Sequence, residues 1–395
     1  MNEILVTLDE YLDGNNWRKP ALLSLIVILA IALRLIFIEI SNSDYTDCFL
    51  LWYEQFLKVG RIDAYQEMFF NYSPALPYLI DVMTLFRGIP GVIAVKLIPI
   101  VFDFVAAAGV MKIVKIRYPK GSLPVLAFGI FLFLPTVFVV SSMWGQFDSI
   151  FTAFLVWCFY FLLQERYWLA MLSFSVAFCF KLQAVFFGPI LLILLLRRKI
   201  PFYQFFLIPV VYFISVVPAW LAGGPLDELL LAYFAQFGNF RELSKAAPNL
   251  YSFLPATPPG YEVIVWIGLG IALAVTLGYV FLRWRKWKDL GQVSLGYDAA
   301  FFTLLVPFLL PKMHDRYFFT ACVFIFILFF YDPRTIGLVL LSQVSSTMAY
   351  IVFLTTFPEV ITRIAAVFTV LLVAGWVWMY KNHLHRLHLL SSGAS

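Results

Sequence analysis

Repeated apolar runs, each close to 20 residues long and separated by short polar or basic breaks, constrain this chain more than any other feature. Hydrophobic residues make up 62% of its 395 residues and charged residues 13%, whereas globular proteins are roughly 45–50% apolar. An α-helix needs roughly 20 mostly apolar residues to cross a bilayer. The pattern predicts an all-α polytopic membrane protein and excludes a water-soluble enzyme.

The apolar runs predict about 12 transmembrane helices in a single transmembrane domain that covers residues 1–395. The run 79–86 is only about 12 Å long as a helix, so it is expected to lie at the membrane interface. The run 168–196 is roughly 43 Å long as one helix, so a break is expected at Lys181-Leu182-Gln183. The expected spans are 20–40, 91–113, 122–142, 148–164, 168–181, 183–196, 203–222, 261–283, 296–310, 317–331, 335–353 and 361–380.

The placement of basic residues predicts which loops face outward. Lys and Arg are enriched in cytoplasmic loops, and an inside N-terminus puts most of the 28 Lys and Arg residues on the inner side. Two long loops then face outward: 41–90, with interfacial helices, and 223–260. The net charge of +5 is therefore read as orientation in a lipid bilayer and not as affinity for nucleic acid. The four cysteines show no disulfide or zinc spacing.

Chemically versatile side chains collect on the outer surface of this topology, whereas the inner surface carries mainly Lys and Arg. Each also has a structural interpretation: Asp148 as a helix cap, Lys181 as a snorkelling side chain, and Asn249 as a turn residue. The asymmetry between the two surfaces nevertheless predicts an active site on the extracytoplasmic side. Its candidate residues are Asp44, Asp47, Tyr72, Trp144, Gln146, Asp148, Lys181, Gln183, Asn249, His314, Asp315 and Arg316.

Several of these residues lie in short motifs between residues 44 and 318. The motifs are Asp44-Tyr45 followed by Trp52, Tyr72-Ser73-Pro74-Ala75-Leu76, Trp144-Gly145-Gln146-Phe147-Asp148-Ser149, Phe180-Lys181-Leu182-Gln183-Ala184, Pro248-Asn249, and Lys312-Met313-His314-Asp315-Arg316-Tyr317-Phe318. Together they resemble the GT-C superfamily of integral-membrane glycosyltransferases. The resemblance is strongest to bacterial mannosyltransferase-like proteins related to the second GPI mannosyltransferase.

The resemblance implies a GT-C-like fold, an acidic catalytic base in the first outer loop, and a polyprenyl-phosphate sugar as donor, with mannose favoured. It also implies a bacterial plasma membrane. Two acids in the loop, Asp44 and Asp47, fit the position of the base. The acceptor would be a hydroxyl of a glycan, glycolipid or protein.

Sugar transfer of this kind needs a carboxylate that takes the proton of the attacking hydroxyl. The leaving lipid phosphate needs cationic partners, and Lys181, His314 and Arg316 are the candidates for donor-phosphate binding. One base with a cationic clamp favours inversion at the anomeric carbon, although Asp148 leaves a retaining route open. The remaining candidates, Tyr72, Trp144, Gln146, Asp148, Gln183, Asn249 and Asp315, are assigned to substrate binding.

Two alternatives remain at this stage. A transporter or flippase of sugars or lipid-linked glycans would place ionisable groups near the bilayer midplane and often has internal repeats. The clustering at one interface favours the enzyme.

No spacing requires a metal, but Asp44, Asp47, Asp148 and His314 offer oxygen and nitrogen ligands, so a divalent metal stays open as a cofactor.

Overall fold

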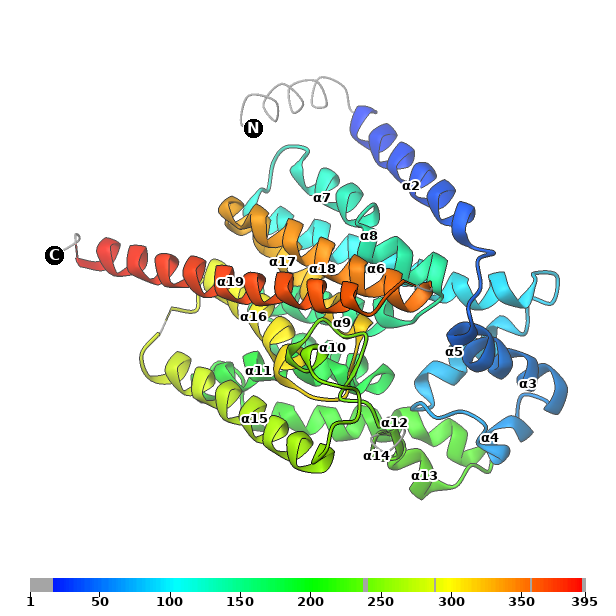
Figure 1. Ribbon diagram of the computed structural model, residues 1–395. Helices are drawn as coiled ribbons and strands as arrows, with labels where there is room; N and C mark the ends of the chain where they lie inside the picture. Colours follow the sequence, from blue (N-terminus) through cyan, green and yellow to red (C-terminus); the bar gives the residue numbers. More distant parts are fainter. Residues whose placement is uncertain (1–16, 237–240, 288, 356, 393–395) are drawn as a thin grey trace. The chain divides into compact units, whose positions relative to one another are not determined.

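The computed structural model describes residues 17–236, 241–287, 289–355 and 357–392, and these are predominantly helical (Figure 1). In these ranges the two β-strands have two residues each, Ser244–Lys245 (β1) and Met313–His314 (β2). The same ranges contain 7 helices that are long and apolar enough to cross a membrane, or 8 if the bent pair Leu123–Leu132 and Pro135–Trp144 is one span. The protein is therefore an all-α polytopic membrane protein, as the apolar runs predict.

The chain divides into two compact units, and each is described by itself. Unit 1 comprises Met1–Ala184 and Phe202–Asn239, and unit 2 comprises Val185–Pro201 and Phe240–Ser395. The first boundary between them falls within a 3₁₀ turn, Leu182–Phe187 (η3). Each unit therefore combines segments that are distant in the sequence.

At the centre of unit 1, α9 (Asp148–Leu163) packs against both α6 (Gly91–Arg117) and α10 (Tyr167–Phe180). Aromatic residues of the segment 45–70, such as Trp52, Phe56 and Tyr65, are buried in its core. Its elements are α2 (Arg18–Phe37), η1 (Tyr45–Leu50), α3 (Leu51–Val59), α4 (Asp63–Glu67), α5 (Ala75–Met83), α6 (Gly91–Arg117), α7 (Leu123–Leu132), α8 (Pro135–Phe138), η2 (Val139–Trp144), α9 (Asp148–Leu163), α10 (Tyr167–Phe180), η4 (Phe202–Phe206), α12 (Leu207–Leu221), α13 (Leu226–Leu230) and α14 (Ala232–Gln236).

The most buried helices of unit 2 are α16 (Gln292–Leu309) and α17 (Phe319–Tyr331). Helices α18 (Ile336–Leu354) and α19 (Val360–Ser392) run alongside each other (Figure 1). The short strands β1 and β2 pair in parallel and join the segment before α15 to the segment after α16. Its other elements are α11 (Gly188–Leu196), η5 (Leu250–Phe253), α15 (Tyr261–Arg285), α16 (Gln292–Leu309), η6 (Asp315–Phe318), α17 (Phe319–Tyr331), η7 (Pro333–Thr335), α18 (Ile336–Leu354) and α19 (Val360–Ser392).

Every apolar run predicted as a span contains a helix, but one of them is not continuous. The run 122–142 breaks between α7 and α8, where the two parts are bent by 48°. Pro135 is the first residue of α8, and a proline disfavours helical geometry in the residue before it. The expected break at Lys181 is confirmed, because α10 ends at Phe180 and Lys181 is extended.

The two long loops predicted from the sequence contain local structure. Residues 41–90 hold η1, α3, α4 and the short helix α5, which begins before the apolar run 79–86 and covers most of it. Residues 223–260 hold α13, α14, β1 and η5, while 237–240 lie outside the described residues.

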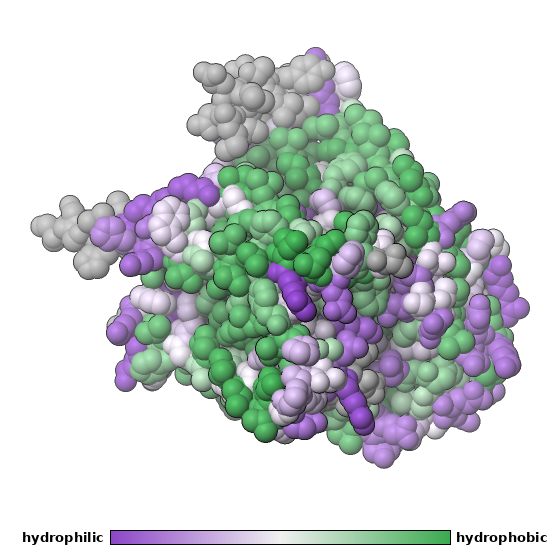
Figure 2. All heavy atoms as spheres, in the orientation of Figure 1, coloured by the Kyte–Doolittle hydropathy of each residue, from purple (hydrophilic) through white to green (hydrophobic). Residues whose placement is uncertain are grey.

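Exposed apolar faces on long helices agree with the membrane class. In α2 the exposed side chains include Ile28 and Ile36, and in α15 they include Trp266 and Leu273. Apolar side chains cover both helices in Figure 2. Exposure of such apolar faces to water is unfavourable. Contact with lipid tails is not, because the backbone hydrogen bonds of a helix are already satisfied within it.

Two buried ion pairs lie within the long helices, one in each unit. In unit 1, Arg34 of α2 donates from Nε and Nη2 to Oδ2 of Asp103 on α6, at 3.0 and 2.7 Å. Ser141 donates to the same oxygen at 2.5 Å. In unit 2, Arg283 and Asp298 form a corresponding pair at 2.8 Å. These pairs join neighbouring helices, because an unpaired charge in an apolar interior is strongly unfavourable.

Replacing Arg34 by Met is expected to destabilise the protein by about 3–5 kcal/mol, because Asp103 is left buried without its cation. The double variant Arg34→Met/Asp103→Leu should recover most of that loss, since a buried ion pair replaced by apolar groups is often close to neutral. Thermal unfolding in detergent measures both. Arg363→Met, at an exposed position on α19, is the control; equal losses in Arg34→Met and in the control would refute the stabilising pair.

Candidate functional site

The candidate residues from the sequence divide between the two units. Unit 1 contains Asp44, Asp47, Tyr72, Trp144, Gln146, Asp148, Lys181 and Gln183, and unit 2 contains Asn249, His314, Asp315 and Arg316. Within each unit the structure shows which of them meet.

Asp44 contacts the Trp144-Gly145-Gln146 turn, about a hundred residues further along the chain. Its Oδ2 accepts a hydrogen bond of 2.6 Å from Nε2 of Gln146 and a longer one of 3.3 Å from Nε1 of Trp144. Two donors on one oxygen fix the orientation of the carboxylate. Trp144 and Gln146, assigned to substrate binding from the sequence, therefore also position Asp44.

Asp44 and the turn are brought together by Lys96, a fully buried residue of α6. Its ammonium donates to the carbonyls of Ser142 and Met143 at 3.0 and 3.1 Å, and also to the carbonyl of Ile40. In the sequence Lys96 stands out as a charged residue inside an apolar run. The sequence does not show that its partners are backbone carbonyls of two other segments.

Tyr45 strengthens the same junction. Its hydroxyl donates to the carbonyl of Val92 on α6 at 2.7 Å, and burial raises the pKa of Tyr45, so the hydroxyl stays a neutral donor. Asn42 donates from Nδ2 to the carbonyl of Trp144 at 3.3 Å. Sequence reasoning did not assign Tyr45 or Asn42 a role, although Tyr45 was part of the motif beside Asp44.

Both segments that meet here contain π-helical turns. Asp44 immediately precedes η1, and Gly145 immediately follows η2. The π-helical geometry leaves carbonyls outside the regular α-helical pattern and is frequent at functional sites. In this protein Lys96 takes up two such carbonyls, at Ser142 and Met143.

Asp47, the second candidate base, lies in a different environment. It is exposed, and its Oδ1 accepts a hydrogen bond of 3.0 Å from the hydroxyl of Thr46. Asp44 is partly buried and is held by residues of a distant turn. The two acids cannot be distinguished in the sequence, whereas their geometry favours Asp44 as the positioned carboxylate.

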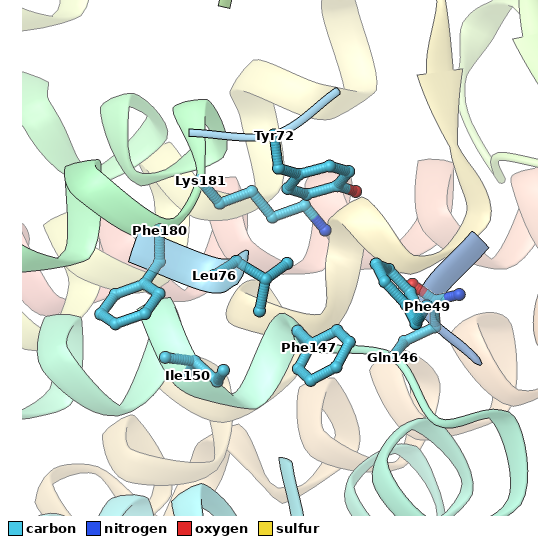
Figure 3. Close-up of a pocket in the computed structure, with 8 residues that line it drawn as sticks. All are labelled: Phe49, Tyr72, Leu76, Gln146, Phe147, Ile150, Phe180 and Lys181. Atoms are coloured by element: carbon cyan, nitrogen blue, oxygen red, sulfur yellow. The ribbon is translucent and has the colours of Figure 1, made fainter. Parts of the chain in front are cut away.

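A small pocket in unit 1 lies beside this junction (Figure 3). Gln146, Tyr72 and Lys181 contribute its polar groups, and Figure 3 shows the Lys181 ammonium and the Tyr72 ring on the same side of it. Tyr72 packs edge-on against Phe49 and Trp52. The pocket is lined by Phe49, Tyr72, Leu76, Gln146, Phe147, Ile150, Phe180 and Lys181.

Lys181 forms an ion pair with Asp148 at 2.7 Å. Lys181 sits in extended backbone where α10 ends, and Asp148 begins α9. Asp148 is not the N-cap of that helix, because the N-cap position belongs to Phe147. Gln183 lies in η3, is half-buried, and is not among the residues that line the pocket. The Asp148–Lys181 pair therefore offers a hydrogen-bond acceptor and a donor next to each other.

In unit 2, the motif after α16 forms a compact polar cluster. Nδ1 of His314 lies 3.1 Å from Oδ1 of Asp315 and 3.2 Å from Nη1 of Arg316. The backbone N–H of Arg316 donates to Oδ1 of Asp315 at 2.7 Å. All three side chains are buried, so their arrangement is set by the local fold.

Asn249 holds backbone in this unit. It donates from Nδ2 to the carbonyl of Leu310 at 3.1 Å and accepts from the backbone N–H of Tyr251 at 3.1 Å. These contacts agree with the turn interpretation of the residue. A further lysine, Lys245 on β1, pairs with His314 across the two strands and was not among the predicted site residues.

Metal binding would need several His, Cys, Asp or Glu side chains close together. Across the part of the chain that the structure describes, no three or more His, Cys, Asp or Glu residues are grouped so that they could hold a metal ion.

No family model matches the chain, and no curated protein matches it significantly. The class of the protein therefore rests on its fold, a polytopic helical membrane protein in which a carboxylate is held by a tryptophan and a glutamine next to a small, largely aromatic pocket.

Replacing Gly145 by Ala is expected to cost about 1–3 kcal/mol of stability. Gly145 has φ +78°, and a Cβ there would lie 2.6 Å from the ring of Tyr45, so both backbone strain and a steric clash oppose the substitution. Thermal unfolding in detergent measures the effect. Gly278→Ala on α15, where nothing lies within 4 Å of the added carbon, is the control, and a variant at Gly145 as stable as this control would contradict the tight junction.

Proposed function

We propose that the protein is a glycosyltransferase that moves a sugar, with mannose favoured, from a polyprenyl-phosphate donor to an acceptor hydroxyl at the outer membrane face. Asp44 is the general base, and the reaction inverts the anomeric carbon. The observation that carries this proposal is the 2.6 Å hydrogen bond that holds the Asp44 carboxylate against Gln146, beside the pocket that Gln146 lines.

A general base is effective when its carboxylate is held in one orientation and still carries its charge. Asp44 meets the first condition through the Gln146 and Trp144 hydrogen bonds, and we propose that it reacts as a carboxylate. An ordinary solvated loop acid would not be expected to accept hydrogen bonds from two side chains of a turn about a hundred residues away.

The aromatic pocket and the Asp148–Lys181 pair fit a sugar. Pyranose rings carry hydroxyls that both donate and accept, so a carboxylate beside an ammonium can bind them from both directions. Asp148 balances the charge of Lys181. We therefore assign this pair to binding sugar hydroxyls, in preference to binding the donor phosphate. His314 and Arg316 remain the residues proposed for the phosphate.

The proposal includes a GT-C-like fold with about 12 membrane crossings. In that case the shorter apolar helices, such as α9 and α10, also cross, although they are about 24 and 21 Å long against roughly 30 Å of hydrocarbon. Their 16 and 14 residues would require a locally thinner bilayer or flanking residues that complete the crossing.

Asp44→Asn is expected to lower sugar transfer by roughly 10²–10⁴-fold, because the amide cannot accept the hydroxyl proton. The amide keeps the size of the carboxylate, so the fold should persist. The measurement uses purified protein in detergent, polyprenyl-phosphate mannose with labelled sugar, and glycolipid acceptors. Glu54→Gln, an exposed acid on α3, is the matched control and should retain activity.

Asp47→Asn decides between the two loop acids. A large loss in Asp47→Asn with little loss in Asp44→Asn would move the role of the base to Asp47. Uptake of an unmodified sugar into vesicles, with no transferred label in any assay, would refute the enzyme and support a transporter.

Gln146→Glu is expected to move the acid limb of the pH–rate profile to higher pH. The variant places a second carboxylate against Asp44, and two adjacent carboxylates resist simultaneous ionisation, so the base is lost at a higher pH than in the parent protein. Gln55→Glu on α3 is the control for the added charge. An unchanged acid limb in Gln146→Glu would show that Asp44 is not the group that titrates in the reaction.

A further inference from the structure

A hydrogen bond joins the ends of two helices of unit 2, α11 and α15. Nη1 of Arg197, the residue after α11, donates to the carbonyl of Trp284 near the end of α15 at 3.2 Å. The two residues are 87 apart in the sequence. Each lies in a strongly basic segment, so the contact brings two basic segments together. The segments are Arg197-Arg198-Lys199 and Arg283-Trp284-Arg285-Lys286.

The chain turns sharply after α11 and exposes Arg198 and Lys199. Their backbone N–H groups donate to the carbonyls of Leu195 and Leu194, both at 2.8 Å. Arg198 has a φ of 57°, a left-handed conformation that commonly ends a helix. Both side chains are exposed. Backbone hydrogen bonds therefore hold two cations at the end of this helix.

The end of α15 adds two more exposed cations, Arg285 and Lys286. The guanidinium carbon of Arg285 lies 4.5 Å from the ring centre of Trp284, a cation–π contact. Arg283 differs from them, because it is buried and forms an ion pair with Asp298. The exposed cations of the two helix ends are called the basic patch here: Arg198, Lys199, Arg285 and Lys286.

The sequence around the basic patch contains little negative charge. Residues 194–200 include no acid, and residues 281–290 include one, Asp289. The carboxylate of Asp289 accepts hydrogen bonds from the hydroxyl of Ser294 and the backbone N–H of Gly291, at the beginning of α16. Four exposed cations against one acid favour an anionic partner.

An exposed apolar face of α15 leads to the basic patch. Phe281 lies one turn before Arg285, and Leu277 lies one turn before Phe281. The exposed fractions of Phe281 and Leu277 are 51% and 46%. The ring of Phe281 also contacts Trp284 edge-on, with 6.0 Å between the ring centres. The helix therefore presents a surface for an acyl chain and, directly after it, a surface for an anion.

We propose that the basic patch binds the phosphate of an anionic phospholipid, whose acyl chain lies against Phe281 and Leu277. Arg and Lys are the usual partners of phosphate oxygens, and basic clusters at the ends of membrane helices bind anionic lipid head groups. The placement of basic residues predicts that both helix ends face the cytoplasm, and Trp284 is a residue type enriched at the membrane interface. The adjoining apolar face favours a phospholipid over a free phosphate. The site is independent of the proposed sugar transfer, which uses neither segment.

The test measures equilibrium binding to the full-length protein in a neutral detergent. The probes are phosphatidylglycerol, the zwitterionic lipid phosphatidylcholine, and inorganic phosphate. The double variant Arg198→Gln/Arg285→Gln is expected to weaken phosphatidylglycerol by about 30-fold, the effect of losing two basic residues near a membrane surface. Its affinity for phosphatidylcholine should not change. Lys115→Gln/Arg117→Gln, at two exposed basic residues in the last turn of α6, is the matched control and should retain the affinity for phosphatidylglycerol.

The proposal requires that the parent protein binds phosphatidylglycerol more tightly than either other probe. Equal affinities for phosphatidylglycerol and inorganic phosphate would overturn it in favour of a free anion. Equal weakening of phosphatidylglycerol in the two double variants would overturn it in favour of a general attraction to basic residues. Unchanged affinity in Arg198→Gln/Arg285→Gln would overturn it as well. All four replaced side chains are exposed, and thermal unfolding checks that both variants are folded.

A second measurement uses the unmodified protein. The protein is placed in nanodiscs of phosphatidylcholine with and without phosphatidylglycerol, lysines are acetylated, and the modified residues are identified by mass spectrometry. Phosphatidylglycerol is expected to protect Lys199 and Lys286 and to leave Lys115 unprotected. Equal acetylation of Lys199 and Lys286 in both nanodiscs would refute the site. Neither measurement involves sugar transfer, so a protein without transferase activity would refute the proposed function and leave this site intact.

Discussion

The structure around the candidate site depends on one buried ammonium group, that of Lys96. A charge in an apolar interior is unfavourable unless it finds hydrogen-bond partners, and Lys96 finds them at the carbonyls of Ile40, Ser142 and Met143. These carbonyls belong to the segment before Asp44 and to the turn before Gln146. The stabilisation of one lysine therefore joins two segments that local interactions would leave apart.

Acidic side chains hold together segments that are distant in the sequence. Asp103, Asp148 and Asp298 each pair with a cationic side chain, which balances their charge. The two hydrogen bonds that reach Asp44 from the Trp144-Gly145-Gln146 turn come from neutral groups. The ion pairs stabilise contacts between helices, and the two hydrogen bonds to Asp44 hold its carboxylate in one orientation, which a group that accepts a proton needs.

The ion pair between Lys181 and Asp148 changes the interpretation of a residue predicted to bind phosphate. Viewed in the sequence, Lys181 is an isolated cation at a helix break. In the structure Lys181 Nζ lies 2.7 Å from Oδ1 of Asp148, which balances its charge. The pair is therefore better suited to binding neutral hydroxyls than to binding an anion.

The sequence by itself determined the membrane class and the location of the long apolar helices, because apolar runs of this length must avoid water and a helix satisfies its own backbone hydrogen bonds. Pro135 was a visible signal of the break in the run 122–142, although the π-helical turn after it was not. Only the tertiary structure decided which polar groups meet. Asp44 and Gln146 are 102 residues apart, and Arg34 and Asp103 are 69 apart. Hydrogen bonds act over about 3 Å, so the choice of partner depends on how the helices pack and not on the spacing of residues along the chain.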